Sequence, residues 1–191
     1  MTTPDPYFEP HSPVQLNQSQ HIALIGFSGS QVHQSAAFLS SMTGMTLIEV
    51  DQWVSHRAGC SVAQLYLEQG EKAWRTLEAQ CLQDIFLSRP YAIICLNERS
   101  LNAQSNVKLC SQNSHLFYLR CSAQHLFERI VQGRKTNPRR FPYWVHHAPT
   151  SVKDVQQQLE PLQKKYENAQ SFIEANHLSA LAIALKILKQ L

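Results

Sequence analysis

The chain has 191 residues, of which 43% are hydrophobic and only 16% are charged, so it can bury one full core. A formal net charge of +3 is too small to indicate binding to nucleic acid or to a membrane surface. Five cysteines without a C-x-x-C pair, and no apolar run of the roughly 18 residues that span a membrane, predict a soluble cytoplasmic protein with reduced thiols.

The sequence predicts an N-terminal tail followed by a single domain. Residues 1–20 are rich in proline and end in a polar run, so we expect a flexible N-terminal tail, followed by a domain over residues 21–191. The expected strands are 22–26, 46–50, 91–96, 116–119 and 171–174, and the expected helices lie near 33–43, 61–69, 71–88, 101–111, 123–132, 151–168 and 179–190. Continuous apolar strands separated by helices are typical of a parallel sheet covered on both faces.

The first expected strand leads into a sequence with the frame of a phosphate-binding loop, G-x-x-x-x-G-K-[ST]. In such a loop the second glycine lets the backbone approach phosphate, the lysine neutralises charge and the hydroxyl binds Mg²⁺. Here Gln31, Val32 and His33 stand at those three positions, so the cation and the oxygen ligand are missing. Gly26, Gly29 and Ser30 complete this degenerate loop, in which Ser28, Ser30 and the N-terminus of the following helix keep a weak capacity for an anion.

The segment from Gly133 to Thr150 interrupts the alternation of strands and helices. It combines prolines and basic residues with Phe141, Tyr143 and Trp144, a composition typical of an exposed excursion. Basic residues beside aromatic ones can bind nucleic acid, but one short cluster on a nearly neutral chain argues against that partner.

Four further blocks, together with the loop, make residues 21–191 resemble shikimate kinase. They read L-I-E-V-D at 47–51, R-A-G-C-S-V-A-Q-L-Y at 57–66, G-E-K-A-W-R-T-L-E at 70–78 and L-R-C-S-A-Q-H-L-F-E-R at 119–129, in the family's order. The resemblance implies an α/β fold of three layers, like that of P-loop kinases. Its five-stranded parallel sheet would have the order 2-3-1-4-5, with helices on both faces and a lid at about 133–150. Nucleotide would lie over the first strand-to-helix turn.

The resemblance also implies roles on the acid-substrate side. Asp51 matches the aspartate that binds substrate hydroxyls and would be the catalytic residue of an active enzyme, and Arg75 matches the arginine that pairs with the substrate carboxylate. Glu49 replaces the family's first aspartate. Two structural alternatives stay open: Asp51 caps the following helix, and Arg75 only forms an ion pair with a nearby carboxylate.

Three other positions depart from the family's pattern. The triple glycine after the third strand is replaced by Leu96-Asn97-Glu98, whose side chains we expect to fill part of the cleft, with Glu98 repelling phosphate or carboxylate. The lid arginine is replaced by Asn137, and a later arginine that contacts the carboxylate by Leu162, four residues before Tyr166. The basic residues that could substitute are Arg134, Arg139 and Arg140 in the lid and Lys164 and Lys165 near Leu162.

The sequence also allows predictions about metal and cofactor binding. The histidines His33, His125, His146 and His147 show no ligand spacing with a cysteine or carboxylate, so we expect no metal site. A non-catalytic chain needs no cofactor, whereas an active kinase would need ATP and Mg²⁺.

Three functions compete. The leading hypothesis is a shikimate-kinase-like pseudoenzyme that has lost ATP-dependent phosphoryl transfer and acts as a binding, regulatory or assembly module, with a shikimate-like small acid or a protein as its partner. The first alternative is an active kinase of shikimate or a related small molecule, with a rearranged phosphate site and a place in aromatic amino-acid synthesis. The second is a pure protein-interaction domain.

Overall fold

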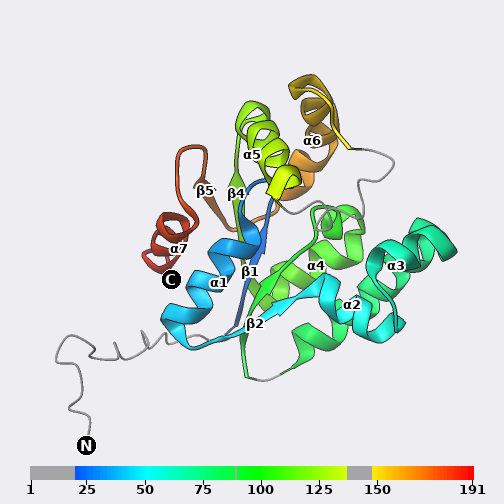
Figure 1. Cartoon of the computed structure of the whole chain (residues 1–191). Helices are drawn as coiled ribbons and strands as arrows, with labels where there is room; N and C mark the ends of the chain where they lie inside the picture. The colour runs from blue at the N-terminus through cyan, green and yellow to red at the C-terminus, as the bar shows by residue number, and fades with distance from the viewer. Residues whose placement is uncertain (1–19, 89, 137–147) are drawn as a thin grey trace, which may run out of the picture.

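One parallel sheet forms the centre of the computed structural model, which describes residues 20–88, 90–136 and 148–191. Its strands are β1 (His21–Ile25), β2 (Thr46–Glu49), β3 (Ala92–Cys95), β4 (Ser114–Arg120) and β5 (Ser171–Glu174). They pair in parallel in the order β2-β3-β1-β4-β5, which confirms the predicted topology (Figure 1). All carboxyl ends therefore meet at one edge of the sheet, where ligands of open α/β folds bind.

Helices cover the sheet on both faces. They are α1 (Val32–Thr43), α2 (Val50–Ala58), α3 (Val62–Leu87), α4 (Gln104–Asn113), α5 (Ala123–Thr136), α6 (Val152–Tyr166) and α7 (Ala180–Leu188), with a 3₁₀ turn η1 (Ser100–Asn102). In Figure 1, α1 and α7 lie together on one face, α4 lies on the other, and α2 and α3 gather beyond β2. The three predicted layers are therefore present.

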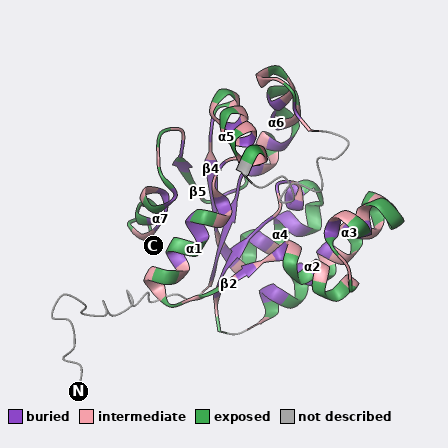
Figure 2. Cartoon of the chain, in the orientation of Figure 1, coloured by how far each residue is buried: buried purple, intermediate pink, exposed green. Residues whose placement is uncertain are grey.

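The central strand β1 explains why the sheet forms. All of its residues are fully buried, and it pairs with β3 on one side and β4 on the other (Figure 2). His21 is the polar exception, and its Nδ1 accepts a hydrogen bond from the Ala92 amide at 3.0 Å. One nitrogen of this buried ring is thus paired with the neighbouring strand β3.

The structure differs from the sequence prediction at several element boundaries. The strand expected over 46–50 ends at Glu49, and Val50 begins α2, a helix that the prediction missed. The two helices expected on either side of Gly70 form the single element α3, in which Gly70 is non-helical (φ 79°, ψ 175°). The helix expected near 101–111 begins at Gln104, after η1, and the one expected over 123–132 continues to Thr136.

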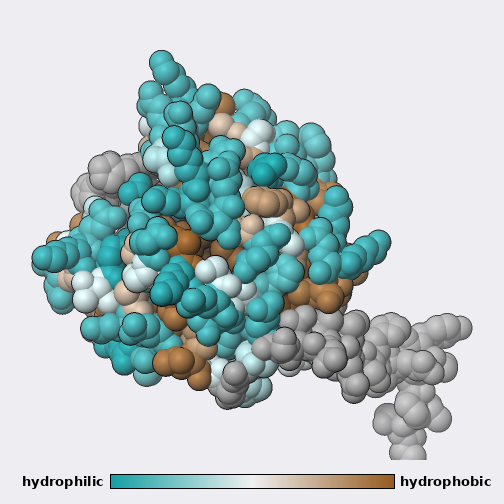
Figure 3. All heavy atoms as spheres, turned by 180° about the vertical axis from the view of Figure 1, so that it is seen from behind, coloured by the Kyte–Doolittle hydropathy of each residue, from teal (hydrophilic) through white to brown (hydrophobic). Residues whose placement is uncertain are grey.

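The rear surface of the molecule is mostly polar (Figure 3). Figure 3 shows a rear face dominated by hydrophilic side chains with small, separate apolar areas. None of the helices in the described ranges is long and apolar enough to cross a membrane. The predicted tail, apart from Gln20, and residues 137–147 of the predicted lid lie outside the described residues.

Candidate functional site

The loop between β1 and α1 has a conformation that normally requires glycine. Gln31 has φ 68° and ψ 25°, and no other non-glycine residue in the described ranges has a positive φ. This left-handed region is costly for residues with a side chain. The Gln31 side chain reaches across to the β5–α7 connection, where Nε2 donates to the Leu178 carbonyl at 2.9 Å. The loop thus keeps a glycine-type backbone without the glycine.

Arg129 of α5 fixes this loop in place. Its guanidinium donates to the Gly29 carbonyl at 3.3 Å and to the carbonyls of Ala175 and Asn176 at 3.0 and 2.9 Å. One side chain therefore joins the loop to the connection that follows β5. All but one of its acceptors among the described residues are backbone carbonyls, the exception being Sγ of Cys121 at 3.4 Å, so the contact depends mainly on the fold.

The side chains that begin α1 offer no cation to the loop. Val32 is buried in the core. The Nδ1 atom of His33 lies 3.2 Å from Oε1 of Glu49, at the end of β2. The position that carries lysine in a phosphate-binding loop is thus packed against apolar residues, and the next position pairs with a carboxylate.

A carboxylate of the chain itself lies against the loop. Oε2 of Glu98 accepts hydrogen bonds from the Ser28 amide at 3.1 Å and the Ser28 hydroxyl at 2.7 Å. Glu98 is only 7% exposed, and burial raises its pKa above the ordinary value while the Ser28 hydrogen bonds oppose that change. Ser30, also buried, has a hydroxyl with no hydrogen-bond partner among the described residues. The Ser28 donors of the loop are therefore already occupied by a carboxyl group of the chain itself.

Helix α6 holds the segment that carries Glu98. The hydroxyl of the fully buried Tyr166 donates to the Glu98 carbonyl at 2.7 Å, and burial raises the pKa of Tyr166 well above its ordinary value. The Arg99 amide donates to Oδ1 of Asn97 at 3.0 Å. Leu162, one turn before Tyr166, is also buried.

Asp51 lies in the first turn of α2, after the N-cap residue Glu49, so it is not the cap that one alternative expected. Its carboxylate accepts hydrogen bonds from Nδ2 of Asn97 at 3.2 and 3.4 Å. Burial raises the pKa of Asp51, and the hydrogen bond from Asn97 acts against that. The residue at the position of a family glycine is thus the direct partner of Asp51.

Arg75 does form the ion pair that the structural alternative expected. Its Nη1 donates to Oε2 of Glu78 at 2.8 Å, and its guanidinium lies 3.7 Å from the centre of the Trp74 ring. Glu78 is fully buried, and its other oxygen accepts from the Ser100 hydroxyl at 2.7 Å. Nη2 of Arg75 is buried and has no hydrogen-bond partner among the described residues.

The remaining predicted positions do not gather into one site. Arg134, at the end of α5, donates to the Pro149 carbonyl at 3.2 Å, while Asn137, Arg139 and Arg140 lie outside the described residues. His125 faces His177, with 3.3 Å between Nε2 and Nδ1. In the part of the chain that the structure describes, no group of three or more His, Cys, Asp or Glu residues could hold a metal ion. His146 and His147 lie outside that part.

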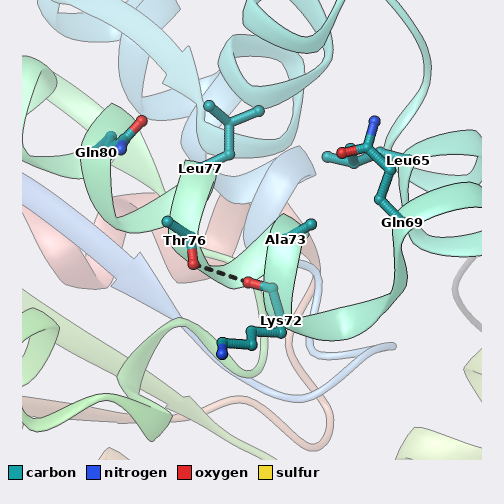
Figure 4. Close-up of a pocket in the computed structure, with 7 residues that line it drawn as sticks. All are labelled: Leu65, Gln69, Lys72, Ala73, Thr76, Leu77 and Gln80. Carbon is teal, nitrogen blue, oxygen red and sulfur yellow. Dashed lines mark hydrogen bonds between the residues drawn. The ribbon is translucent and has the colours of Figure 1, made fainter.

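A separate hollow of ≈ 510 Å³ lies along α3, on both sides of the Gly70 break (Figure 4). Its lining residues are Leu65, Gln69, Lys72, Ala73, Thr76, Leu77 and Gln80. The Thr76 hydroxyl donates to the Lys72 carbonyl at 2.9 Å, which leaves it satisfied within the helix. None of the loop or acid-side residues described above lines this hollow.

Sequence reasoning missed the roles of Glu78 and Arg129. A signal existed for Glu78, because it stands four residues after Trp74 and four before Leu82, on the apolar stripe of a helix. A charged residue on such a stripe needs a buried partner. For Arg129 the sequence holds no comparable signal, because most of its acceptors are backbone carbonyls from two distant segments, the β1–α1 loop and the β5–α7 connection.

Comparisons with known proteins agree with this architecture. The family model described as Shikimate kinase matches residues 34–191, beginning directly after His33. A shikimate kinase of Chlorobium luteolum is 28% identical over 153 residues, covering 80% of this chain and 75% of that protein. One of Thermodesulfovibrio yellowstonii is 25% identical over 171 residues, covering 90% and 94%.

Solved structures show the same fold. Shikimate kinase from Acinetobacter baumannii in complex with shikimate superposes with a TM-score of 0.75 at 20% identity, covering 90% of this chain and 92% of that one. The enzyme from Bacteroides thetaiotaomicron gives a TM-score of 0.72 at 18% identity, covering 90% and 97%.

Proposed function

The chain belongs to the shikimate kinase family, and we propose that it is a non-catalytic member that has lost phosphoryl transfer and binds a small acid. The observation that carries the proposal is the contact between the Glu98 carboxylate and Ser28 in the β1–α1 loop. Phosphoryl transfer depends on positioning and on neutralising negative charge. A carboxyl group fixed on the loop donors occupies them and supplies no positive charge.

The other loop residues do not fit ATP with Mg²⁺. Val32 is an apolar side chain in the core, and His33 presents an imidazole beside Glu49 where Mg²⁺ prefers oxygen ligands. Loss of a single group that stabilises transition-state charge costs about 10²- to 10³-fold in rate. Several losses at one loop therefore support a chain without useful kinase activity.

The acid side supports retained binding. Asp51 keeps a carboxylate that could accept hydrogen bonds from substrate hydroxyls, and Arg75 keeps a planar guanidinium with one buried donor still unused by the described residues. The related Acinetobacter structure contains shikimate, so a hydroxylated monocarboxylate of that kind is the ligand we propose.

A turnover assay tests the loss of catalysis. With ATP, Mg²⁺ and shikimate, we expect no product above background, because the loop neither neutralises phosphate nor binds Mg²⁺. A rate approaching the roughly 1–100 s⁻¹ of ordinary kinases would contradict the proposal and favour an active enzyme with a rearranged phosphate site.

Thermal-shift titration tests ligand binding separately. A ligand at 100 times its dissociation constant stabilises a fold by about 2.7 kcal/mol. We expect a shift with shikimate and none with ATP or ADP. A shift with neither ligand would favour the protein-interaction alternative.

Loop restoration tests the role of Glu98. We expect the variant with Gln31→Gly, Val32→Lys and His33→Ser to bind no ADP in calorimetric titration while Glu98 is present. Adding Glu98→Gly should permit binding, whereas adding Glu174→Gly, a change at an exposed ion pair with Arg120, should not. ADP binding by the triple variant alone would show that Glu98 does not block the loop.

A further inference from the structure

Two arginine side chains meet on one exposed carboxylate, that of Glu71. Nε of Arg75 lies 3.6 Å from Oε1 of Glu71, and Nη1 of Arg99 lies 4.0 Å from the same oxygen. Glu71 and Arg75 belong to α3, whereas Arg99 follows β3, so the fold brings the two guanidinium groups together from distant segments.

We infer that Arg75 and Arg99 together bind the carboxylate of a small acid, and that Glu71 is the internal carboxylate that the bound acid displaces. This deepens the proposed function and rests on its acid-binding part. It gives Arg99 a binding role and Glu71 a competing role, neither of which the sequence indicated.

The distances show that Glu71 is a weak occupant. Both exceed the roughly 2.7–3.2 Å of a nitrogen–oxygen hydrogen bond, so Glu71 holds neither guanidinium tightly. Its side chain is 46% exposed, whereas those of Arg75 and Arg99 are 20% and 27% exposed. The acid can therefore turn into solvent at little cost, since exposed ion pairs contribute only about 0–1 kcal/mol.

The side chain of Arg75 and the backbone at Arg99, in contrast, are held in position. Arg75 is fixed by its 2.8 Å contact with Glu78 and by the Trp74 ring beneath it. The backbone at Arg99 is fixed through the Asn97 side chain, and the preceding carbonyl through Tyr166. Groups that are already positioned lose little freedom when a ligand binds, which favours affinity.

The charge balance favours a monocarboxylate. When Glu71 turns away, Glu78 still pairs with Arg75, so one internal carboxylate stays beside the ligand. Burial raises the pKa of both Asp51 and Glu98, and the charge of Arg75 acts against that change, so these acids lie within its electrostatic reach. They would repel a doubly charged anion, while Asp51 can accept hydrogen bonds from hydroxyl groups of an acid.

Calorimetric titration of shikimate into the full chain at pH 7.5 tests the site. We expect Arg99→Ala to weaken binding at least tenfold, and Glu71→Ala to tighten it several-fold because the competing carboxylate is gone. The exposed pair Arg120–Glu174 provides charge-matched controls, and Arg120→Ala and Glu174→Ala should leave affinity within about twofold. Urea unfolding of each variant verifies that it is folded.

The methyl ester of shikimate separates a binding role from a structural one. It lacks the free carboxylate, so neither Arg99→Ala nor Glu71→Ala should change its weak binding. Equal effects on acid and ester would overturn the assignment. So would an Arg99→Ala protein that binds the acid like the wild type, or a Glu71→Ala protein that does not bind it more tightly.

A third variant distinguishes this inference from the proposed function. If Arg75→Ala abolishes acid binding but Arg99→Ala does not, acid binding stands and the two-arginine site falls. If the wild-type chain itself does not bind shikimate at millimolar concentration, both the proposed acid binding and the two-arginine site are wrong. The loss of phosphoryl transfer is still decided by the turnover assay alone.

Discussion

Gly29 stands where a side chain would meet two obstacles at once. Its φ is +90°, and a Cβ there would lie 2.9 Å from the Leu126 carbonyl of α5. Gly59, at the end of α2, has a similar φ of +69° but open space around the missing Cβ. The two glycines thus separate backbone strain from steric conflict.

We expect Gly59→Ala to lower the free energy of unfolding by about 1–2 kcal/mol, the cost of a left-handed residue. Gly29→Ala should cost clearly more, because α5 must also move away from the loop. Urea denaturation of both variants measures the difference. Equal losses would mean that α5 yields freely at Leu126.

At this scale the sequence shows which residues occupy the loop but not what they touch. It identifies Gln31, Val32 and His33 as substitutions in a motif, and Asp51 and Arg75 as retained positions. The contact of Glu98 with Ser28 joins residues 70 positions apart and depends on a side-chain rotamer. Spacing along the chain carries no information about such a rotamer, so the expected repulsion gave no hint of this hydrogen bond.

Helix α6 and the segment after β3 are joined by one buried hydroxyl. The bond from Tyr166 to the Glu98 carbonyl measures 2.7 Å, and both groups are inaccessible to water. Tyr118, whose ring packs 4.9 Å from that of Tyr166, is equally buried but makes no hydrogen bond through its hydroxyl to the described residues. The pair therefore offers a matched comparison.

Tyr166→Phe should lower the free energy of unfolding by about 1–3 kcal/mol, because a buried carbonyl loses its partner. Tyr118→Phe should change it by less than about 0.5 kcal/mol. Chemical denaturation monitored by circular dichroism measures both. A Tyr166→Phe protein as stable as the wild type would show that another donor satisfies the Glu98 carbonyl.

Elements whose apolar residues follow one clear pattern along the sequence were predictable, whereas helix α2 was not. The strands of the sheet are short apolar runs between helices, which only a doubly covered parallel sheet accommodates. At Val50 the apolar run of β2 continues directly into the helix, so the pattern contains no boundary. Val50 and Val54 lie one helical turn apart and are both buried, a spacing too short to identify a helix by itself.

The stability of the whole molecule should depend on pH through its buried acids. Burial raises the pKa of Glu98 and Asp51 above their ordinary values of 4.5 and 3.8. The folded chain then binds protons that the unfolded chain releases, so the stability from these groups is present at low pH and is lost as pH rises through the raised pKa values. His115 acts in the opposite direction, because burial lowers its pKa below 6.5.

Comparison with Glu98→Gln isolates one of these groups. We expect the variant to be more stable than the wild type at pH 8, by about 1.4 kcal/mol for each unit by which the pKa of Glu98 is raised. The difference should vanish as pH falls toward 4.5. Urea denaturation across this range measures it, with the exposed Glu174→Gln as control. A variant that is less stable at pH 8 would mean that the charged carboxylate stabilises the loop.

The position of β1 has a consequence for amide hydrogen exchange. Because Ile22, Ala23 and Leu24 are fully buried and paired on both sides, their amide protons should exchange only through unfolding of the entire molecule. The edge strands β2 and β5, each paired on one side, should exchange earlier through local opening. The β1–α1 loop therefore starts from the segment with the slowest exchange. A bound ligand that raises the free energy of unfolding should slow the exchange of the β1 amides by that whole increase.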